Sequence, residues 1–118
     1  MLELLHLVLN NQKKILFPTS EGVHILASEE IMYLESESNY TTVFLKDGRK
    51  IVISKTLKNV EEQLKEYSFL RVHSTYIVNL NEIEKYIRGD GGQLILKNKT
   101  SIPVSRTYKL SLLAVLGM

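Results

Sequence analysis

Short runs of apolar residues, separated by turn residues, make up most of the chain. Several of these runs alternate between apolar and polar positions, which is typical of sheets with one face in water. Asp47-Gly48 lies between two such runs and favours a hairpin turn. The runs are rich in β-branched and aromatic residues and predict strands over 15–19, 23–27, 31–35, 40–45, 50–54, 77–80, 83–88, 93–96 and 100–104. The predicted fold class is therefore mostly β, with sandwich-like multi-stranded sheets.

Two segments instead repeat their apolar residues with a helical period. Within 54–66, Leu57, Val60 and Leu64 line one face and Thr56 can cap the start, which predicts one amphipathic helix. Near the C-terminus, Ser105 can cap a second helix that ends at Gly117. This second helix is apolar almost all round, so we expect other parts of the fold, or a partner chain, to cover it from two sides.

The first 13 residues are treated separately from the predicted domain at 14–118. Their leucines suit a helix, and their brevity suits a strand; we favour a helix. We expect this segment to be a linker or N-terminal arm. A chain of 118 residues is otherwise long enough for one domain with one core.

Composition narrows the class of protein. The absence of cysteine excludes disulfides, thiolate zinc sites and cysteine nucleophiles, and favours a reducing compartment. The apolar runs fall far short of the roughly 20 residues that span a bilayer, so we expect a cytoplasmic protein without a membrane partner. Residues 1–66 carry eight Lys/Arg and ten Asp/Glu, a net −2, whereas 67–118 carry seven and three, a net +4. The basic second half suggests a polyanion partner.

No pattern in the sequence indicates an enzyme, a metal site or a cofactor. His73 and Ser74 are adjacent, so in an extended chain their side chains point to opposite faces and cannot form a catalytic pair. The three histidines lack the spacing of metal ligands. The stretch Gly89-Asp-Gly-Gly92 lacks the Lys-Ser/Thr of a phosphate-binding loop and predicts a hairpin tip.

Three polar segments interrupt the apolar pattern. Asn39 and Tyr40 lie between two strand runs, 71–75 interrupts a core segment, and 105–109 joins a strand to a helix. A helix that begins at Ser105 would direct N–H groups toward an anion. Each segment also has an ordinary structural interpretation: Asn39 as a turn residue, His73 as a buried histidine and Arg106 as a solvated cation.

Five stretches of the sequence, in order, resemble the LytTR family of bacterial DNA-binding domains: "SNYTTVFLKDGR", "ISKTL", "FLRVHSTYIVNLNEI", "YIRGDGGQLIL" and "IPVSRTYK". The likeness runs from about Lys14 to Lys109. It is similar above all to the output domain of two-component response regulators, in which a receiver domain precedes this one. The resemblance implies an elongated β fold whose loops, rather than a recognition helix, enter DNA grooves.

The resemblance also implies which residues touch DNA. The matching positions are Asn39 and Tyr40, then His73, Ser74 and Thr75, and finally Ser105, Arg106 and Thr107. These are the same three polar segments. Many relatives carry a basic residue or Asn where this chain has Ser74, which puts its base preference in question.

Physical chemistry suggests a role for each candidate. Arg106 can donate to guanine O6 and N7, and Asn39 can pair with adenine N6 and N7. Lys55, Arg71 and Lys109 suit phosphates. Because the net charge is only +2, we expect weak binding by a monomer and a homodimer on promoter DNA with repeated half-sites.

The alternative is a β-rich protein-interaction or dimerisation module that does not bind DNA. In that case the apolar C-terminal helix and residues 1–9 form the working surface.

Overall fold

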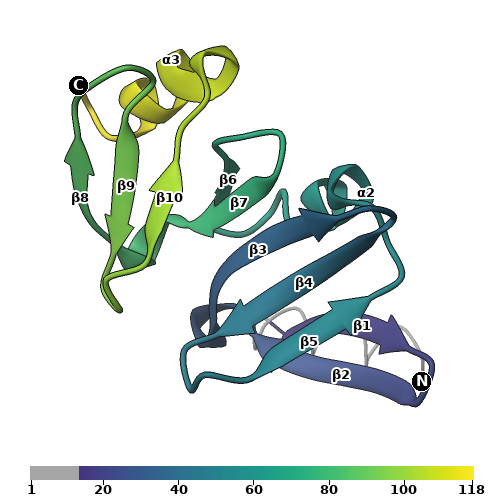
Figure 1. Cartoon of the computed structure of the whole chain (residues 1–118). Coiled ribbons are helices and arrows are strands. Elements are labelled where there is room, and N and C mark those ends of the chain that lie inside the picture. The colour runs from purple at the N-terminus through teal and green to yellow at the C-terminus, as the bar shows by residue number, and fades with distance from the viewer. Residues whose placement is uncertain (1–13) are drawn as a thin grey trace.

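The computed structural model describes residues 14–118, and the expectations for 1–13 lie outside the described residues. The described chain is mostly β and elongated, 50 × 30 × 25 Å (Figure 1). Its strands are β1 (Lys14–Thr19), β2 (Gly22–Ala27), β3 (Ile31–Glu37), β4 (Tyr40–Leu45), β5 (Lys50–Ile53), β6 (Phe69–Arg71), β7 (Tyr76–Asn79), β8 (Ile83–Ile87), β9 (Gln93–Leu96) and β10 (Ser101–Pro103). Its α-helices are α2 (Leu57–Gln63) and α3 (Arg106–Val115). The predicted fold class is confirmed.

The strands form three antiparallel sheets. β1 and β2 form a hairpin, β5-β4-β3-β7-β6 form a five-stranded sheet, and β10-β9-β8 form a three-stranded sheet. Short turns join most sequential neighbours, as the turn residues predict. Among the described strands, β7 also pairs with a strand distant in sequence, β3, which is the middle strand of the five-stranded sheet.

The structure has two apolar cores rather than the one that we expected. The β1–β2 hairpin and α2 cover one face of the five-stranded sheet, and Leu34, Val43 and Val60 are fully buried there. The second core lies between the three-stranded sheet, α3 and part of β7. Ile77 belongs to the first core and its neighbour Val78 to the second, because successive side chains in a strand point to opposite faces.

Asn79, the last residue of β7, is polar but buried, because its side chain is hydrogen-bonded. Its side-chain amide donates to the carbonyl oxygens of Ser28 (3.3 Å) and Ile31 (2.8 Å), and its Oδ1 accepts from the N–H of Asn81 (3.0 Å). A buried amide is tolerated only when it is hydrogen-bonded. Asn79 therefore fixes the end of β7 against the start of β3.

The two α-helices differ from their predictions in detail. α2 is seven residues long, and Oγ1 of its N-cap Thr56 accepts from the N–H of Asn59 (3.3 Å). α3 begins after Ser105 as predicted, but the Ser105 hydroxyl makes no capping hydrogen bond.

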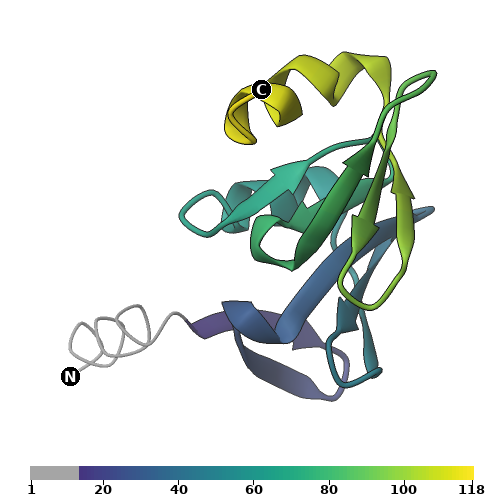
Figure 2. The same cartoon turned by 90° about the vertical axis from the view of Figure 1, so that its left-hand side faces the viewer.

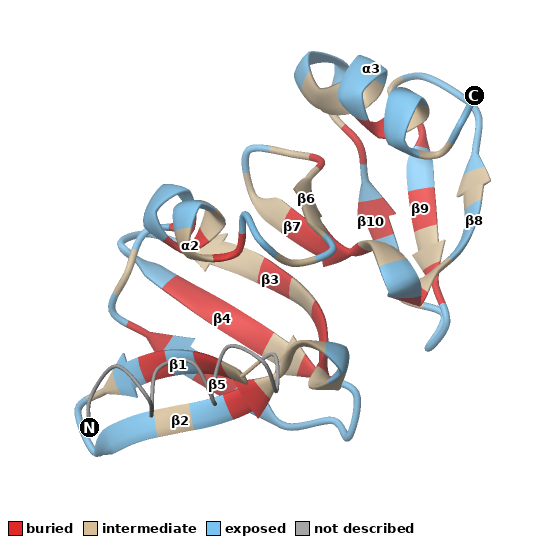
Figure 3. Cartoon of the chain, turned by 180° about the vertical axis from the view of Figure 1, so that it is seen from behind, coloured by how far each residue is buried: buried red, intermediate tan, exposed pale blue. Residues whose placement is uncertain are grey.

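Within the described residues, the fold of this chain covers α3 on one side only, so the second cover that we expected would have to come from a partner chain. Leu112 is fully buried, whereas Leu110 is 80% exposed and Val115 and Met118 are more than half exposed. Figure 3 shows the contrast between the buried β4 and the exposed surfaces of β2 and α3. None of the helices in the described part of the chain is long and apolar enough to cross a membrane.

Candidate nucleic-acid interface

The three polar segments lie together on one side of the molecule. We call the surface that they form the loop face: the β3–β4 turn (38–40), the β6–β7 loop (72–75) and the β10–α3 junction (104–107). The backbone N–H of Ser36 donates to the carbonyl of Thr75 (2.8 Å), and that of Ser105 donates to the carbonyl of Val72 (3.0 Å). The β6–β7 loop is thus fastened to the end of β3, which leads into the β3–β4 turn, and to the β10–α3 junction. Figure 2 shows the loop face on the right-hand side, edge-on.

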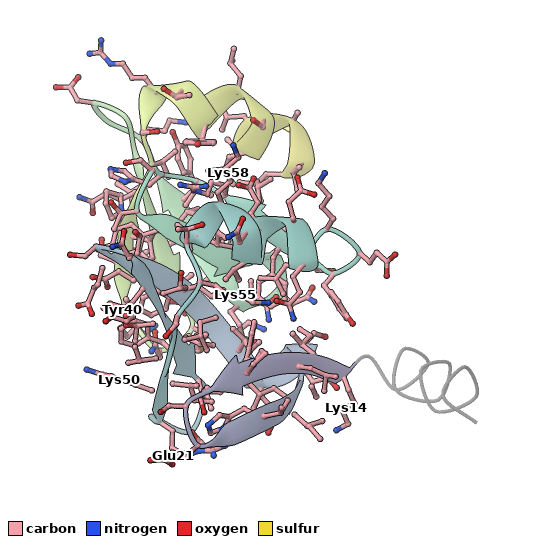
Figure 4. All side chains as sticks on the ribbon, turned by 90° about the vertical axis from the view of Figure 1, so that its right-hand side faces the viewer. Lys14, Glu21, Tyr40, Lys50, Lys55 and Lys58 are labelled. Carbon is pink, nitrogen blue, oxygen red and sulfur yellow. The ribbon has the colours of Figure 1, made fainter. Side chains whose placement is uncertain are left out.

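The β3–β4 turn places its polar residues in solvent. Ser38 has a positive φ of 55°, which turns the chain sharply before β4 begins. Asn39 is exposed, and Tyr40 is 50% exposed. Tyr40 projects toward the loop-face side in Figure 4. An exposed amide beside an exposed aromatic ring can donate, accept and stack.

Arg71 braces the β6–β7 loop from within. Its Nε donates to the carbonyl of His73 (3.0 Å), its Nη2 to the carbonyl of Ser74 (2.6 Å), and its Nη1 to Oε1 of Glu61 in α2 (2.9 Å). The guanidinium also lies 5.8 Å from the ring centroid of Tyr108, and the side chain is only 14% exposed. Three of the five guanidinium N–H donors are thus engaged within the chain, and the low exposure of the side chain limits its reach to the phosphate that we expected it to contact.

His73 is held at the outer end of this loop. Its Nδ1 accepts from the N–H of Thr75 (3.1 Å), so in the neutral ring the proton lies on Nε2. The ring meets Tyr76 edge to face at 5.7 Å between centroids. Ser74, next in the chain, is exposed. The loop therefore offers the N–H of a half-buried imidazole and an exposed hydroxyl, whose oxygen lies 3.5 Å from Nδ1 of His73.

A row of aromatic rings leads from His73 across the five-stranded sheet, and our reading of the sequence missed it. Tyr76 lies 6.3 Å from Tyr33, which stacks on Phe44 at 4.4 Å, and the ammonium of Lys50 lies 5.3 Å from the Phe44 ring. Tyr33, Phe44 and Tyr76 lie on three different strands, β3, β4 and β7. Their positions on one face of the sheet were the signal in the sequence that could have predicted the row. Burial, then the Glu35 carboxylate, raises the pKa of Tyr76, so its hydroxyl stays protonated near neutral pH.

The β10–α3 junction presents cations at a helix N-terminus. Arg106 and Thr107 are exposed, and Lys109 is half-buried one turn along. Within residues 14–118, Arg106 takes part in no ion pair. The Ser105 hydroxyl is buried without a hydrogen-bond partner. Helix N-termini carry partial positive charge and unsatisfied N–H groups, which together favour anions.

Lys55 lies at the edge of this arrangement. Its carbonyl accepts from Oγ1 of Thr41 (2.7 Å), next to the β3–β4 turn, but its ammonium is 3.4 Å from Oε1 of Gln63 in α2. In Figure 4 Lys55 lies toward the viewer below α2, whereas Tyr40 lies at the left. The Lys55 ammonium is thus directed to α2 and not to the β3–β4 turn. Within the described range, no three metal-ligating side chains cluster.

Comparison with known proteins gives the same family as the motifs. A family model described as "LytTr DNA-binding domain" matches residues 21–117. The chain is 32% identical over 100 residues to the sensory transduction protein LytT of Bacillus subtilis (strain 168), which is 82% of this chain and 41% of LytT. It is 29% identical over 113 residues to the transcriptional regulatory protein BtsR of Escherichia coli (strain K12), which is 92% of this chain and 46% of BtsR. The chain thus spans less than half the length of these relatives.

A solved structure agrees with the assignment. The "LytTr DNA-binding domain of putative methyl-accepting/DNA response regulator from Bacillus cereus" superimposes with a TM-score of 0.76 at 26% sequence identity. The superposition covers 90% of this chain and 98% of that one. The resemblance seen in the sequence motifs is confirmed, and this chain belongs to the LytTr DNA-binding domain family.

Proposed function

We propose that the chain binds double-stranded promoter DNA at specific sequences, regulates transcription, and contacts the DNA grooves with the loop face. The observation that carries this proposal is a pair of backbone hydrogen bonds: Ser36, at the end of β3 just before the β3–β4 turn, donates to Thr75, and Ser105 donates to Val72. They hold the β6–β7 loop between the other two polar segments. Preorganised loops lose less conformational entropy on binding than mobile ones. Membership of a DNA-binding domain family supports the choice of DNA as the ligand.

The proposed division of labour follows from which donors remain available. Arg106 donates to guanine O6 and N7, His73 donates from Nε2 to a base acceptor, and Asn39 pairs with adenine. The remaining loop-face groups, namely Tyr40, Ser74, Thr75, Ser105, Thr107 and Lys109, contact phosphates and sugars or line the groove. Lys55 is an outer phosphate contact, and Arg71 positions the β6–β7 loop.

Two copies of the chain are needed for useful affinity. Phosphate neutralisation supplies most non-specific affinity, and the net charge of this chain is only +2. We therefore propose homodimers on repeated half-sites. In a longer protein of the response-regulator type, a receiver domain upstream would control this pairing.

The first test of the proposal is the selection of bound duplexes from a random pool. The selected site is then titrated by anisotropy with the wild-type chain and with Arg106→Ala. Lys97→Ala is the matched control, because Lys97 is an exposed cation in the β9–β10 turn, at the other end of the three-stranded sheet (Figure 1). We expect enrichment of a common sequence, and a loss only in Arg106→Ala. No enrichment, or equal losses in both variants, would contradict it.

One observation favours a second candidate function, a protein-interaction module. Leu110 and Val115 of α3, and Met118 after its end, are exposed, and exposed apolar patches often mark protein contacts. Sedimentation with and without the selected duplex separates the two functions. Self-association that DNA does not change would favour the interaction module.

A further inference from the structure

The β8–β9 turn, residues 88–92, is packed against the β10–α3 junction. The N–H of Val104 donates to the carbonyl of Gly92 (3.0 Å). A Cβ added to Gly91 would lie only 2.8 Å from the carbonyl oxygen of Val104. The turn is therefore held directly beside the residue that precedes Ser105, although 12 or more residues separate the two segments in sequence.

Glycines make this close packing possible. Gly91 and Gly92 have φ values of +80° and +87°, which L side chains rarely adopt. A Cβ on Gly92 would also overlap the ring of Tyr86 in β8. The stretch that the sequence suggested to be only a hairpin tip thus has a backbone shape fixed by its neighbours.

The turn projects to the same side as the loop face. In Figures 2 and 4 the β8–β9 turn and the β3–β4 turn are the two parts of the described chain that extend furthest to that side, and the β6–β7 loop and the start of α3 lie between them. Arg88, Gly89 and Asp90 are all exposed. Arg88 forms no ion pair with any of the residues that the structure describes.

We propose that the β8–β9 turn is a fourth DNA-contacting segment, in which Arg88 neutralises a backbone phosphate and Asp90 opposes a neighbouring phosphate. This inference rests on the proposed function. A duplex seated on the β10–α3 junction would pass beside the turn, because the turn is packed against that junction. Arg88 then supplies a contact that positions the protein without reading a base. Asp90 limits affinity through like-charge repulsion and so keeps binding dependent on the base contacts.

Two charge changes of opposite sign test the turn. The full chain is titrated against its selected duplex by anisotropy over a series of salt concentrations, as wild type, Arg88→Ala, Asp90→Asn and the control Lys97→Ala. Arg88→Ala should remove one phosphate contact. The slope of the log binding constant against log salt concentration should then become shallower by about 0.9, and binding should weaken about eightfold at 0.1 M salt. Asp90→Asn should remove the repulsion between the Asp90 carboxylate and a phosphate. At roughly 7 Å in water, this should tighten binding about two- to threefold.

The controls separate this inference from the proposed function. Circular dichroism melts should match the wild type, because both side chains are exposed. If Arg88→Ala and Lys97→Ala bind alike while Arg106→Ala is impaired, the turn does not contact DNA and the loop face still does. If Arg106→Ala also binds like the wild type, the proposed function fails together with this inference. A tighter complex with Asp90→Asn and a weaker one with Arg88→Ala would support it.

Discussion

The β6–β7 loop and the β4–β5 turn are both polar, but they differ in how their polar groups are used. The β4–β5 turn, residues 46–49, has the higher density of cations. Its Lys46 ammonium lies 3.3 Å from the buried carboxylate of Glu82, and Nε of Arg49 lies 2.8 Å from Oδ2 of Asp47. Hydrogen bonds from the Arg49 backbone N–H and side chain lower the pKa of Asp47. These cations are already engaged within the chain.

The β6–β7 loop contains no Lys or Arg, and the cation that precedes it, Arg71 at the end of β6, points inward. Its candidate donors to a ligand are instead the Nε2 of His73 and the Ser74 hydroxyl, in a loop that is fixed by bonds from Arg71 to the carbonyls of His73 and Ser74 and from the N–H of Thr75 to Nδ1 of His73. The loop is also fastened to both neighbouring segments, as described above. The comparison teaches that polar groups held in place by a braced backbone, rather than the local density of charge, distinguish the candidate interface.

Arg71→Ala tests the bracing role, for which we expect the largest effect. Arg71→Ala removes three hydrogen bonds: the Ser74 carbonyl loses the donor from Arg71, and the His73 carbonyl keeps only the N–H of Tyr76 (3.2 Å). This should lower the free energy of unfolding by about 2 kcal/mol. Binding of the selected duplex should weaken as well. Thermal unfolding and anisotropy measure the two effects, and Arg49→Ala in the β4–β5 turn is the comparison, with a change of less than about 0.5 kcal/mol.

Arg71→Lys distinguishes bracing from phosphate contact. A lysine keeps the positive charge but has no planar fork to reach both carbonyls and Glu61. We expect a loss of stability close to that of Arg71→Ala. Wild-type stability and affinity in Arg71→Lys would return Arg71 to the phosphate contacts.

Arg106→Ala should weaken specific binding by about 1 to 3 kcal/mol and relax one base position, because a bidentate contact to guanine is lost. Its free energy of unfolding should stay at the wild-type value, since the side chain is exposed. Binding-site selection repeated with this variant identifies the relaxed position. A uniform loss across all duplexes would instead make Arg106 a phosphate contact.

Two substitutions of His73 distinguish the roles of its two ring nitrogens, Nδ1 within the loop and Nε2 toward the DNA. An asparagine keeps an acceptor near the position of Nδ1, so His73→Asn should retain the bond from Thr75 but lose the outward donor. His73→Gln should keep the donor and lose the loop bond. We expect His73→Asn to lose about 1 kcal/mol of binding with little change in stability, and His73→Gln to show the reverse. Identical behaviour of the two variants would remove His73 from base contact.

Lys55→Ala should have the smallest effect. A full phosphate contact contributes about 0.9 to the salt slope, but Lys55 must first leave Gln63. For Lys55→Ala we expect the salt slope to change by this value or less, equally for all DNA sequences. For Lys109→Ala we expect the salt slope to change by the whole of about 0.9. Salt titrations of both variants measure the two slope changes. A larger slope change in Lys55→Ala than in Lys109→Ala would contradict this prediction.

Local patterns were enough to predict most of the strands, both α-helices and the three polar segments. Those features depend on periodicity and on turn residues, which neighbouring positions determine. The role of Arg71 could not be predicted, because its carboxylate partner Glu61 lies ten residues earlier in a helix. The open side of α3 and the row of rings from His73 to Phe44 likewise depend on how separate elements pack.

An NMR titration of the chain with its selected duplex tests the central claim most directly, that the three segments of the loop face bind DNA together. We predict that the backbone amides of 38–40, 73–75 and 105–107 shift with one common Kd, while those of the β4–β5 turn at 46–49 do not. Shifts concentrated at 46–49, or along the outer side of α3 at 110–118, with the loop face unchanged, would contradict the account.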